Sequence, residues 1–428
     1  MIYFLFFSFY SLLFVRRRTI AFYIILFFLC SSFFGIVIGN VPEMNSFLDF
    51  FNIIYTLFIL CLFCTCFKNY RLYDVAVPIN VGAFKFLFVF LSLSLVLSFV
   101  INLLIIYKSF SYIMISGADI TSFKNEGEAA ILIRQWVDPN LVRFANFASP
   151  LGLLALAFHF YYLIKVRLYL SVFFLLLSLN VPLAGLHGLS RSGIVQFILM
   201  YAFFYLYSYP AISGRVRLKI NFFVFLILSS VLLAFYYITN ARFSGSYSKS
   251  DVDESVIENR AIYSIFDYFS QWSVNGITVM GNFSLEKIWY GKSSRTFLDE
   301  VLARSGMDMV SYVELRKLTL DDNASSFNGL VATLLYDFGY AGAIAFSLLF
   351  YFFVRLLSPK RGEVQFHNFV CFGSLITLPA LFFTNNYLSN TLFSVGVFYT
   401  MLAFFILRYR FSIRDKCKID AEMLDDSF

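Results

Sequence analysis

The sequence predicts an all-α polytopic membrane protein, and three observations lead to this fold class. Of the 428 residues, 60% are hydrophobic and 14% are charged, and the mean hydropathy is +0.76. Several apolar runs reach the roughly 20 residues that a helix needs to cross about 30 Å of hydrocarbon. Basic residues recur in the short connections between these runs. Because a soluble domain needs far more polar surface, we expect a single integral membrane domain over residues 1–428.

Length and hydropathy predict about eleven membrane spans. The first is followed by Arg16, Arg17 and Arg18, whereas the positive charges of a signal peptide precede its apolar segment. We therefore interpret it as a short membrane helix. The predicted spans cover residues 1–15, 19–39, 50–67, 84–107, 147–164, 168–187, 194–211, 220–238, 329–356, 369–385 and 391–407.

Basic residues occupy every second connection, which predicts the orientation of the chain. By the positive-inside rule this side is cytoplasmic, and an odd number of spans then places the N-terminus outside and the tail, 408–428, inside. The basic residues on this side are Arg16, Arg17, Arg18, Lys68, Arg71, Lys85, Lys165, Arg167, Arg215, Arg217, Lys219, Arg355, Lys360, Arg361, Arg408, Arg410, Arg414, Lys416 and Lys418.

The two longest connections lie on the opposite side. One covers residues 108–146 and the other covers 239–328, which carries mixed charges. Within the second, residues 255–273 and 296–307 are amphipathic, so we expect short helices that lie over the membrane. We find no internal repeat, and we interpret the 239–328 loop as an elaboration of the membrane domain.

The charges and cysteines indicate neither nucleic-acid binding nor a metal site. The net charge of +7 comes from short loops and not from a soluble basic face, so no nucleic acid is expected as a partner. Cys61, Cys64 and Cys66 lie in an apolar run without histidine or carboxylate neighbours. We expect no metal and no other cofactor.

Two arginines are predicted at the membrane surface on the outer side. Arg191 lies in the tight hairpin of "GLHGLSRSGIVQ", and Arg242, in "YYITNARFSGSY", follows the eighth span by about one helical turn. A guanidinium donates two parallel hydrogen bonds to a phosphate and stays charged at physiological pH. The pair could therefore clamp a diphosphate. The alternatives are snorkelling to lipid phosphates for Arg191 and an interfacial anchor for Arg242.

Two further residues are candidates for a general base. About twenty residues separate Asp337 from the end of its span at Leu357, so Asp337 is expected near the outer interface, before a kink at Gly339 and Gly342. There it could act as a base or orient an arginine, or it could be a helix-end residue facing water. His187 is the other candidate, and its alternative is a helix-end histidine bonded to the backbone.

Three short motifs, taken in order, resemble those of the Wzy-type O-antigen polymerases. These are the "SRSG" element that opens a span at Ser190, the "NARF" element at Asn240, and "YDFGYAG" from Tyr336, which follows the large loop. Members of this family have ten to fourteen spans and one or two large periplasmic loops. The resemblance covers most of the chain in its layout.

The resemblance implies a membrane-embedded, GT-C-like glycosyltransferase in the bacterial inner membrane. It would act at the periplasmic face on undecaprenyl-diphosphate-linked oligosaccharides, among membrane lipids and with a chain-length-determining co-polymerase as protein partner. Essential loop arginines of the family carry over to Arg191 and Arg242. An arginine and a glycine separated by ten residues also occur in the family, as Arg295 and Gly306 do here. The substrate-binding residues expected in this way are Ser190, Ser192, Asn240, Asn328, Tyr336 and Arg295.

Two other functions remain as alternatives. An O-antigen ligase shares the layout and the lipid substrate, but ligases usually carry a histidine motif in the large loop, and residues 239–328 contain no histidine. A flippase or another transporter usually shows internal repeats and charged or broken helices at mid-membrane. We therefore favour the polymerase.

Overall fold

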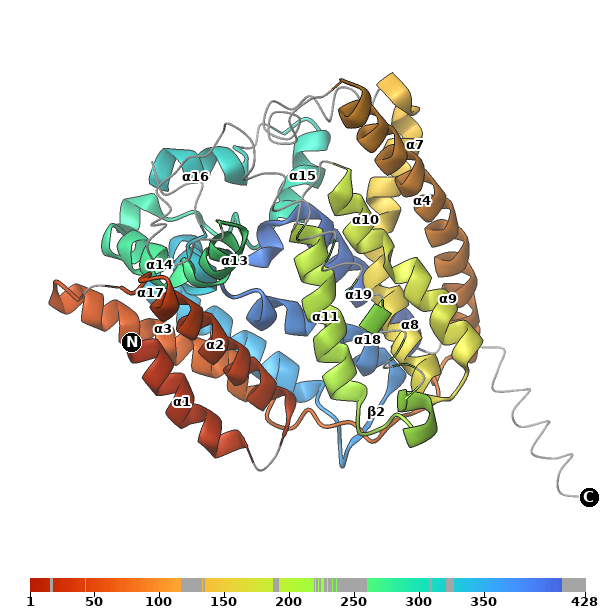
Figure 1. Cartoon of the computed structure of the whole chain (residues 1–428), viewed down its shortest axis with the longest axis horizontal. Helices are drawn as coiled ribbons and strands as arrows, with labels where there is room; N and C mark the ends of the chain where they lie inside the picture. The colour runs from red at the N-terminus through yellow and green to blue at the C-terminus, as the bar shows by residue number, and fades with distance from the viewer. Residues whose placement is uncertain are drawn as a thin grey trace, which may run out of the picture.

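The computed structural model describes residues 1–15, 18–42, 44–116, 133, 135–187, 192–218, 260–307, 310–320 and 327–409, and isolated positions between 220 and 236. These residues form a mostly helical molecule (Figure 1). Seven of its helical segments are long and apolar enough to cross a membrane, and three shorter apolar helices accompany them. The architecture is that of an all-α polytopic membrane protein.

The helices keep their numbering from Figure 1. In chain order they are α1 (Ile2–Phe14), α2 (Ile20–Val37), α3 (Phe47–Thr65), α4 (Val81–Ser116), α7 (Pro139–Ala148), α8 (Gly152–Ile164), α9 (Leu168–Ser178), α10 (Asn180–Leu186), α11 (Ser192–Ser208), α13 (Arg260–Ser270), α14 (Trp272–Gly281), α15 (Thr296–Arg304), α16 (Tyr312–Leu320), α17 (Gly329–Leu356), α18 (Phe366–Ala380) and α19 (Thr391–Arg408). Short 3-10 turns occur at Ser149–Leu151, Leu285–Lys287 and Tyr387–Ser389, and the strands are β1 (Asp74–Val75) and β2 (Glu363–Val364).

Ten of the eleven predicted spans coincide with helices. The remaining one, 220–238, lies mostly outside the described residues. Helix α4 is longer than predicted, because it has 36 residues and continues to Ser116. At 1.5 Å per residue it is about 54 Å long, which exceeds the hydrocarbon thickness of about 30 Å.

The predicted loop over 108–146 is corrected at both ends. Its first nine residues belong to α4, and the helix before α8 already begins at Pro139. A small satellite core supports the extension, because Phe110 and Tyr112 pack against the cluster in which Ile105 of α4 is buried with Ile133 and Val137. Local hydropathy misses this pairing, since the apolar residues that bury α4 come from a separate segment.

Local sequence signals set several helix ends. Ser46 caps α3 by accepting a hydrogen bond from the Asp49 N–H at 3.1 Å, and its hydroxyl donates to the Asp49 carboxylate at 2.8 Å. Inside α17, Gly339 adopts φ 69° and ψ 174°, a backbone conformation that favours glycine. The predicted kink is therefore confirmed at Gly339. It divides α17 into a first part that is largely buried and a second part with exposed apolar residues such as Leu349 and Phe352.

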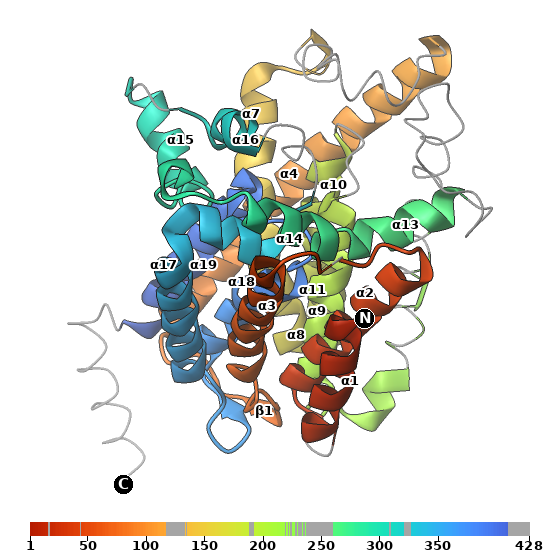
Figure 2. The same cartoon turned by 90° about the vertical axis from the view of Figure 1, so that its left-hand side faces the viewer.

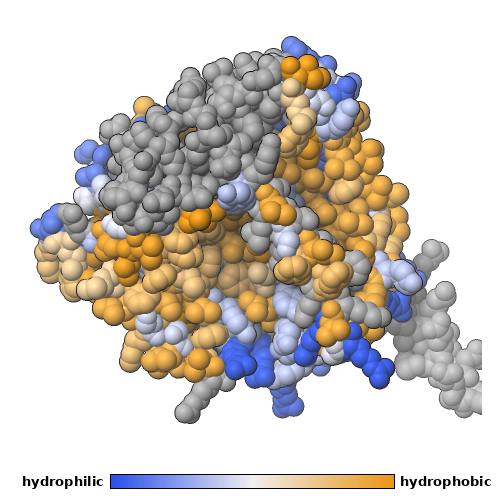
Figure 3. Space-filling view, in the orientation of Figure 1, coloured by the Kyte–Doolittle hydropathy of each residue, from blue (hydrophilic) through white to orange (hydrophobic). Residues whose placement is uncertain are grey.

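Connections rich in basic residues meet at one end of the molecule, which we call the basic end. Strands β1 and β2 pair in parallel there and join the connection after α3 to the connection after α17. The Lys165 ammonium contacts the Asp74 carboxylate at 2.8 Å, and the Ile20 N–H donates to the Tyr70 carbonyl at 3.3 Å. Figure 3 shows hydrophilic residues gathered there, below a broad hydrophobic surface. This grouping is what the predicted alternation of the connections requires.

Short helices of the 239–328 loop cover the opposite end, which we call the capped end. Helices α13 and α14 run across the ends of α2 and α3, and α15 and α16 lie beyond them (Figure 2). The Ser31 hydroxyl of α2 donates to the Phe269 carbonyl at 2.6 Å and accepts from the Trp272 indole at 2.8 Å. The described part of the loop is thus packed on the membrane domain, as expected for an elaboration of that domain.

Candidate functional site

The predicted site residues fall into three groups. Ser190, Arg191, Asn240 and Arg242 lie outside the described residues. His187 ends α10 and Ser192 begins α11, so these two residues flank the predicted arginine hairpin. The remaining residues, Asn328, Tyr336, Asp337 and Arg295, gather around the first part of α17 and the turn that precedes α15.

Asp337 lies at the centre of a buried polar cluster. Its side chain has no exposed surface, and its carboxylate accepts the Ser293 N–H at 2.9 Å, the Ser293 hydroxyl at 2.5 Å and the Ser294 hydroxyl at 2.7 Å. The Asn386 amide donates to both serine hydroxyls, at 3.0 Å and 2.7 Å. We call these four residues the Asp337 cluster. Every donor to the carboxylate is neutral.

The backbone positions the turn that carries the two serines. The Trp289 N–H donates to the Tyr336 carbonyl at 2.7 Å, and the Gly291 N–H donates to the Asp337 carbonyl at 3.0 Å. Gly291 has φ +77°, and a Cβ there would lie 3.1 Å from the Phe338 ring. The turn can therefore follow the end of the first part of α17 because residue 291 is glycine.

The cluster changes the interpretation of Asp337. The alternative in which it faces water is wrong, because the side chain is fully buried. Among the described residues no arginine or lysine forms an ion pair with it. A buried carboxylate with several donors joins the segments that supply them, so its place in the structure is that of an anchor.

Cations flank the cluster in the sequence and contact a second carboxylate. Lys292 Nζ and Arg295 Nε lie 3.4 Å and 3.2 Å from the two Asp299 carboxylate oxygens. The Arg295 side chain is 44% exposed, so it can reach a ligand at the surface without breaking the Asp337 cluster. The Thr391 hydroxyl donates to the Glu300 carboxylate at 2.6 Å, which ties α15 to the start of α19.

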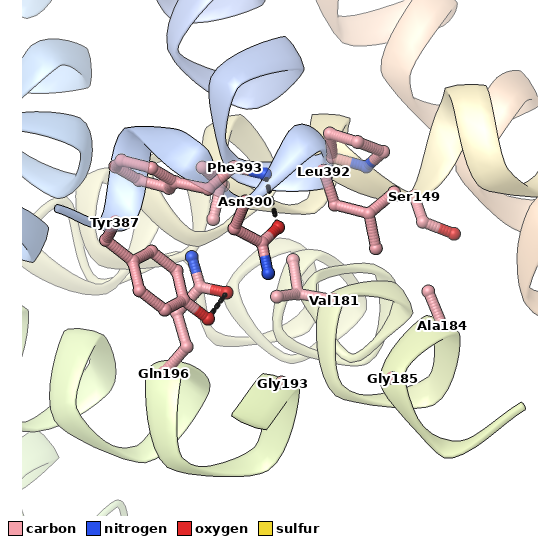
Figure 4. Close-up of a pocket in the computed structure, with 12 residues that line it drawn as sticks. Ser149, Val181, Ala184, Gly185, Gly193, Gln196, Tyr387, Asn390, Leu392 and Phe393 are labelled. Carbon is pink, nitrogen blue, oxygen red and sulfur yellow. Dashed lines mark hydrogen bonds between the residues drawn. The ribbon is translucent and has the colours of Figure 1, made fainter. Parts of the chain in front are cut away.

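A pocket with about 410 Å³ of empty space lies near the predicted arginine hairpin. Its walls come from α10, the start of α11, the turn at Ser149–Leu151 and the start of α19 (Figure 4). Gly185 and Gly193, which line it, stand on either side of the 188–191 segment. A Cβ on Gly193 would lie 3.2 Å from the Val181 carbonyl oxygen, so glycine allows the close approach of α10 and α11.

Polar side chains from two elements meet in the pocket wall. The Tyr387 hydroxyl donates to Gln196 Oε1 at 3.2 Å, and Asn390 Oδ1 accepts the Phe393 N–H at 3.1 Å (Figure 4). His187 follows Gly185 by two residues and is only 8% exposed. Its Nε2 atom has no hydrogen-bond partner among the described residues. A buried imidazole nitrogen without a partner in the fold is available to form a hydrogen bond with a ligand.

The Asp337 cluster and the pocket share one segment of chain. Asn386 belongs to the cluster, and the next residue, Tyr387, lines the pocket. The start of α17 supplies hydrogen-bond donors to the non-helical backbone before Asn386. The N–H groups of Gly329 and Leu330 donate to the carbonyl oxygens of Thr384 and Phe382, at 2.6 Å and 2.8 Å. The anchor on Asn386 therefore also fixes one wall of the pocket.

The sequence reasoning missed Ser293, Ser294, Asn386, Gln196 and Tyr387. One signal could have indicated part of this set, because the polar run "TNNYLSN" from Thr384 interrupts two apolar spans. Asn328, which the sequence predicts to bind substrate, donates its backbone N–H to the Asn385 amide oxygen at 3.0 Å. Tyr336 donates its hydroxyl to the Val279 carbonyl at 3.1 Å and is 1% exposed.

Within the described ranges, no group of three or more histidine, cysteine, aspartate or glutamate side chains stands close enough together to hold a metal ion. In the wider comparisons, no protein-family model, curated protein or solved structure matches the chain. The candidate site is therefore defined by its own residues, as a pocket beside the predicted arginine hairpin and the anchor that fixes one of its walls.

Proposed function

We propose that the chain is a glycosyltransferase that polymerises undecaprenyl-diphosphate-linked oligosaccharide repeat units at the periplasmic face of the bacterial inner membrane. In this proposal the basic end and the C-terminus face the cytoplasm, and the capped end and the N-terminus face the periplasm. One observation carries the proposal. Residues that line the pocket lie on both sides of Arg191 in the sequence, and three of the four helical segments that supply the lining are long and apolar enough to cross a membrane.

The chemistry of the reaction favours this arrangement. The growing polymer leaves one lipid carrier and is joined to the non-reducing end of a new lipid-linked repeat unit. The bond between the sugar and the diphosphate breaks, so negative charge grows on the leaving diphosphate in the transition state. Guanidinium groups of Arg191 and Arg242 would stabilise that charge more strongly than they stabilise the ground state. Arg191 stands two residues before the pocket-lining Gly193 in the sequence.

The acceptor hydroxyl must lose a proton as the new glycosidic bond forms. We assign this proton to His187, because its Nε2 atom is buried and makes no hydrogen bond to any described residue. Asp337 is then an anchor for the pocket wall and not the base. Arg295, which is partly exposed beside the anchor, is available to bind the saccharide.

The test is Arg191→Ala, introduced into a strain that lacks the chromosomal copy of the gene. We expect the variant to insert normally and to leave surface polysaccharide at one repeat unit per lipid A core, seen as the loss of the ladder on a gel. Arg191→Lys is the matched control, because it keeps the charge but loses the two parallel hydrogen bonds, so part of the ladder should return. Long chains in the Arg191→Ala strain would refute the catalytic role.

The same gel distinguishes the alternative functions when the gene is deleted. Loss of a polymerase leaves one repeat unit on the core, and loss of a flippase leaves none. Loss of a ligase leaves polymer on the lipid carrier and none on the core. Only the first pattern agrees with the proposal.

A further inference from the structure

A second and larger hollow lies at the capped end, between the α2–α3 connection and α14, and we call it the outer groove. It is open to the surface, and its empty space of about 1030 Å³ includes part of the surrounding solvent. Figure 2 shows α14 running beside this connection. The polar residues that line the outer groove are Asn40, Asn45, Ser46, Asp49, Thr278 and Asn282.

The lining of the outer groove selects for a neutral ligand with many hydroxyl groups. Amides donate and accept hydrogen bonds at once, hydroxyls do the same, and Asp49 adds the single carboxylate of the described lining. None of the described lining residues is a lysine or arginine, so the groove lacks the cations that a phosphate needs. Leu48, Val274 and Ile277 supply aliphatic surface beside the polar groups.

The polar groups of the groove are held in place, and one is free to bind. The reciprocal hydrogen bonds between Ser46 and Asp49 fix the start of α3. The Thr278 hydroxyl donates to the Val274 carbonyl at 3.1 Å, which leaves its oxygen able to accept. The Asn282 side chain makes no hydrogen bond within the described part of the chain and is exposed. A ligand hydroxyl can therefore pair with it without displacing a partner among the described residues.

The outer groove is separate from the pocket but shares a scaffold with the Asp337 cluster. Helix α14 lines the groove and also packs on α17, where a Cβ on Gly276 would lie 2.7 Å from the Asn328 carbonyl oxygen. The Val279 carbonyl of the same helix accepts the Tyr336 hydroxyl. Helix α14 thus places a fixed polar groove at the end of the molecule that also carries the candidate site.

We propose that the outer groove binds a segment of neutral oligosaccharide and retains the polymer between rounds of transfer. This inference rests on the proposed function for its biological meaning, whereas saccharide binding itself does not depend on it. A polymer that is held at a second point stays near the pocket after its diphosphate leaves. A blocked groove should therefore shorten the chains without abolishing the first transfer.

The test fills the groove with one side chain. Gly281 is the last residue of α14, and a Cβ there would meet nothing within 4 Å, so Gly281→Trp should fold normally. Gly214 also has open space around it and precedes Arg215 at the basic end, so Gly214→Trp is the matched control. We expect the ladder to shift to shorter chains in Gly281→Trp and to stay unchanged in Gly214→Trp. An unchanged ladder in Gly281→Trp would overturn the inference.

A binding measurement separates this inference from the proposed function. The probe is the strain's own surface polysaccharide, released by mild acid and titrated by saturation-transfer NMR against the full-length protein in lipid nanodiscs. We expect binding that Asn282→Ala weakens about fivefold, through the loss of one or two hydrogen bonds. If the wild-type protein does not bind the polysaccharide, the inference that the groove binds saccharide is overturned, even where polymerisation is intact. If the protein binds the polysaccharide but supports no polymerisation, the saccharide-binding role of the groove is supported and the proposed polymerase function is refuted.

Discussion

The two ends of the molecule place charged side chains in different surroundings. At the basic end, the guanidinium groups of Arg71 and Arg217 lie 5.3 Å and 4.3 Å from the ring centres of Tyr73 and Tyr209. At the capped end, the Asp337 carboxylate is fully buried and is bound by neutral donors. Guanidinium groups at the basic end therefore lie against aromatic rings, whereas the buried carboxylate at the capped end is fixed by neutral hydrogen bonds, which strengthen where water is excluded.

The largest expected effect breaks the anchor at the capped end. Asp337→Ala removes the acceptor for three donors, so we expect the free energy of unfolding to fall by about 3 kcal/mol and polymerisation to be lost. Asp337→Asn keeps an acceptor oxygen at nearly the same volume, so we expect it to retain much of the stability and a visible ladder. Thermal unfolding in detergent and the polysaccharide gel measure the two effects.

The asparagine variant also separates the two possible roles of Asp337. A general base cannot be replaced by an amide, because an amide does not take up the proton. If Asp337→Asn melts like the wild-type protein but makes no polymer, Asp337 is a base and not an anchor. Asp337 would then no longer be an example of a buried carboxylate that only fixes the structure of the capped end.

A smaller effect is expected in the pocket wall. Tyr387→Phe deletes the hydroxyl that donates to Gln196 and leaves the ring in place, so we expect a loss of about 1 kcal/mol in stability. Because the pair lines the pocket, KM for a synthetic lipid-linked repeat unit should rise while kcat changes little. An unchanged KM in the reconstituted reaction would show that the substrate does not use this wall.

The smallest effect is expected at the basic end. Lys165 and Asp74 form an ion pair whose side chains are 29% and 55% exposed, so Lys165→Gln should cost less than about 0.5 kcal/mol. We expect normal polymer length, and the melting temperature should depend on salt less than in the wild-type protein. A loss of activity comparable to that of Asp337→Ala would show that the two ends do not differ in the way described.

Some predictions from the sequence succeeded because they depend on local properties. The positions of ten apolar helical segments, seven of them long enough to cross a membrane, follow from hydrocarbon thickness and the rise of a helix, which leave a signal in windows of about twenty residues. The kink in α17 follows from Gly339, whose missing Cβ permits φ 69°. The grouping of the basic connections at one end follows from their alternation along the chain.

Other predictions failed or were missing because they depend on distant contacts. Ser293 and Asn386 are 93 residues apart in the sequence, yet they share a hydrogen bond in the Asp337 cluster. Asp337 lies about one membrane crossing from the end of its helix, so its own helix alone suggests a carboxylate that faces water. In the structure, a turn from another segment covers Asp337. The extension of α4 to Ser116 depends in the same way on its satellite core.

Sequence alone predicts the membrane class, the helical segments and the alternation of basic connections, because hydropathy and loop charge act residue by residue along the chain. Only the folded structure shows that Asp337 is buried among neutral donors, that a pocket forms between α10, α11 and α19, and that a polar groove opens beside α14. The physical reason is that a buried polar group needs partners, and the fold draws those partners from segments that no local pattern connects.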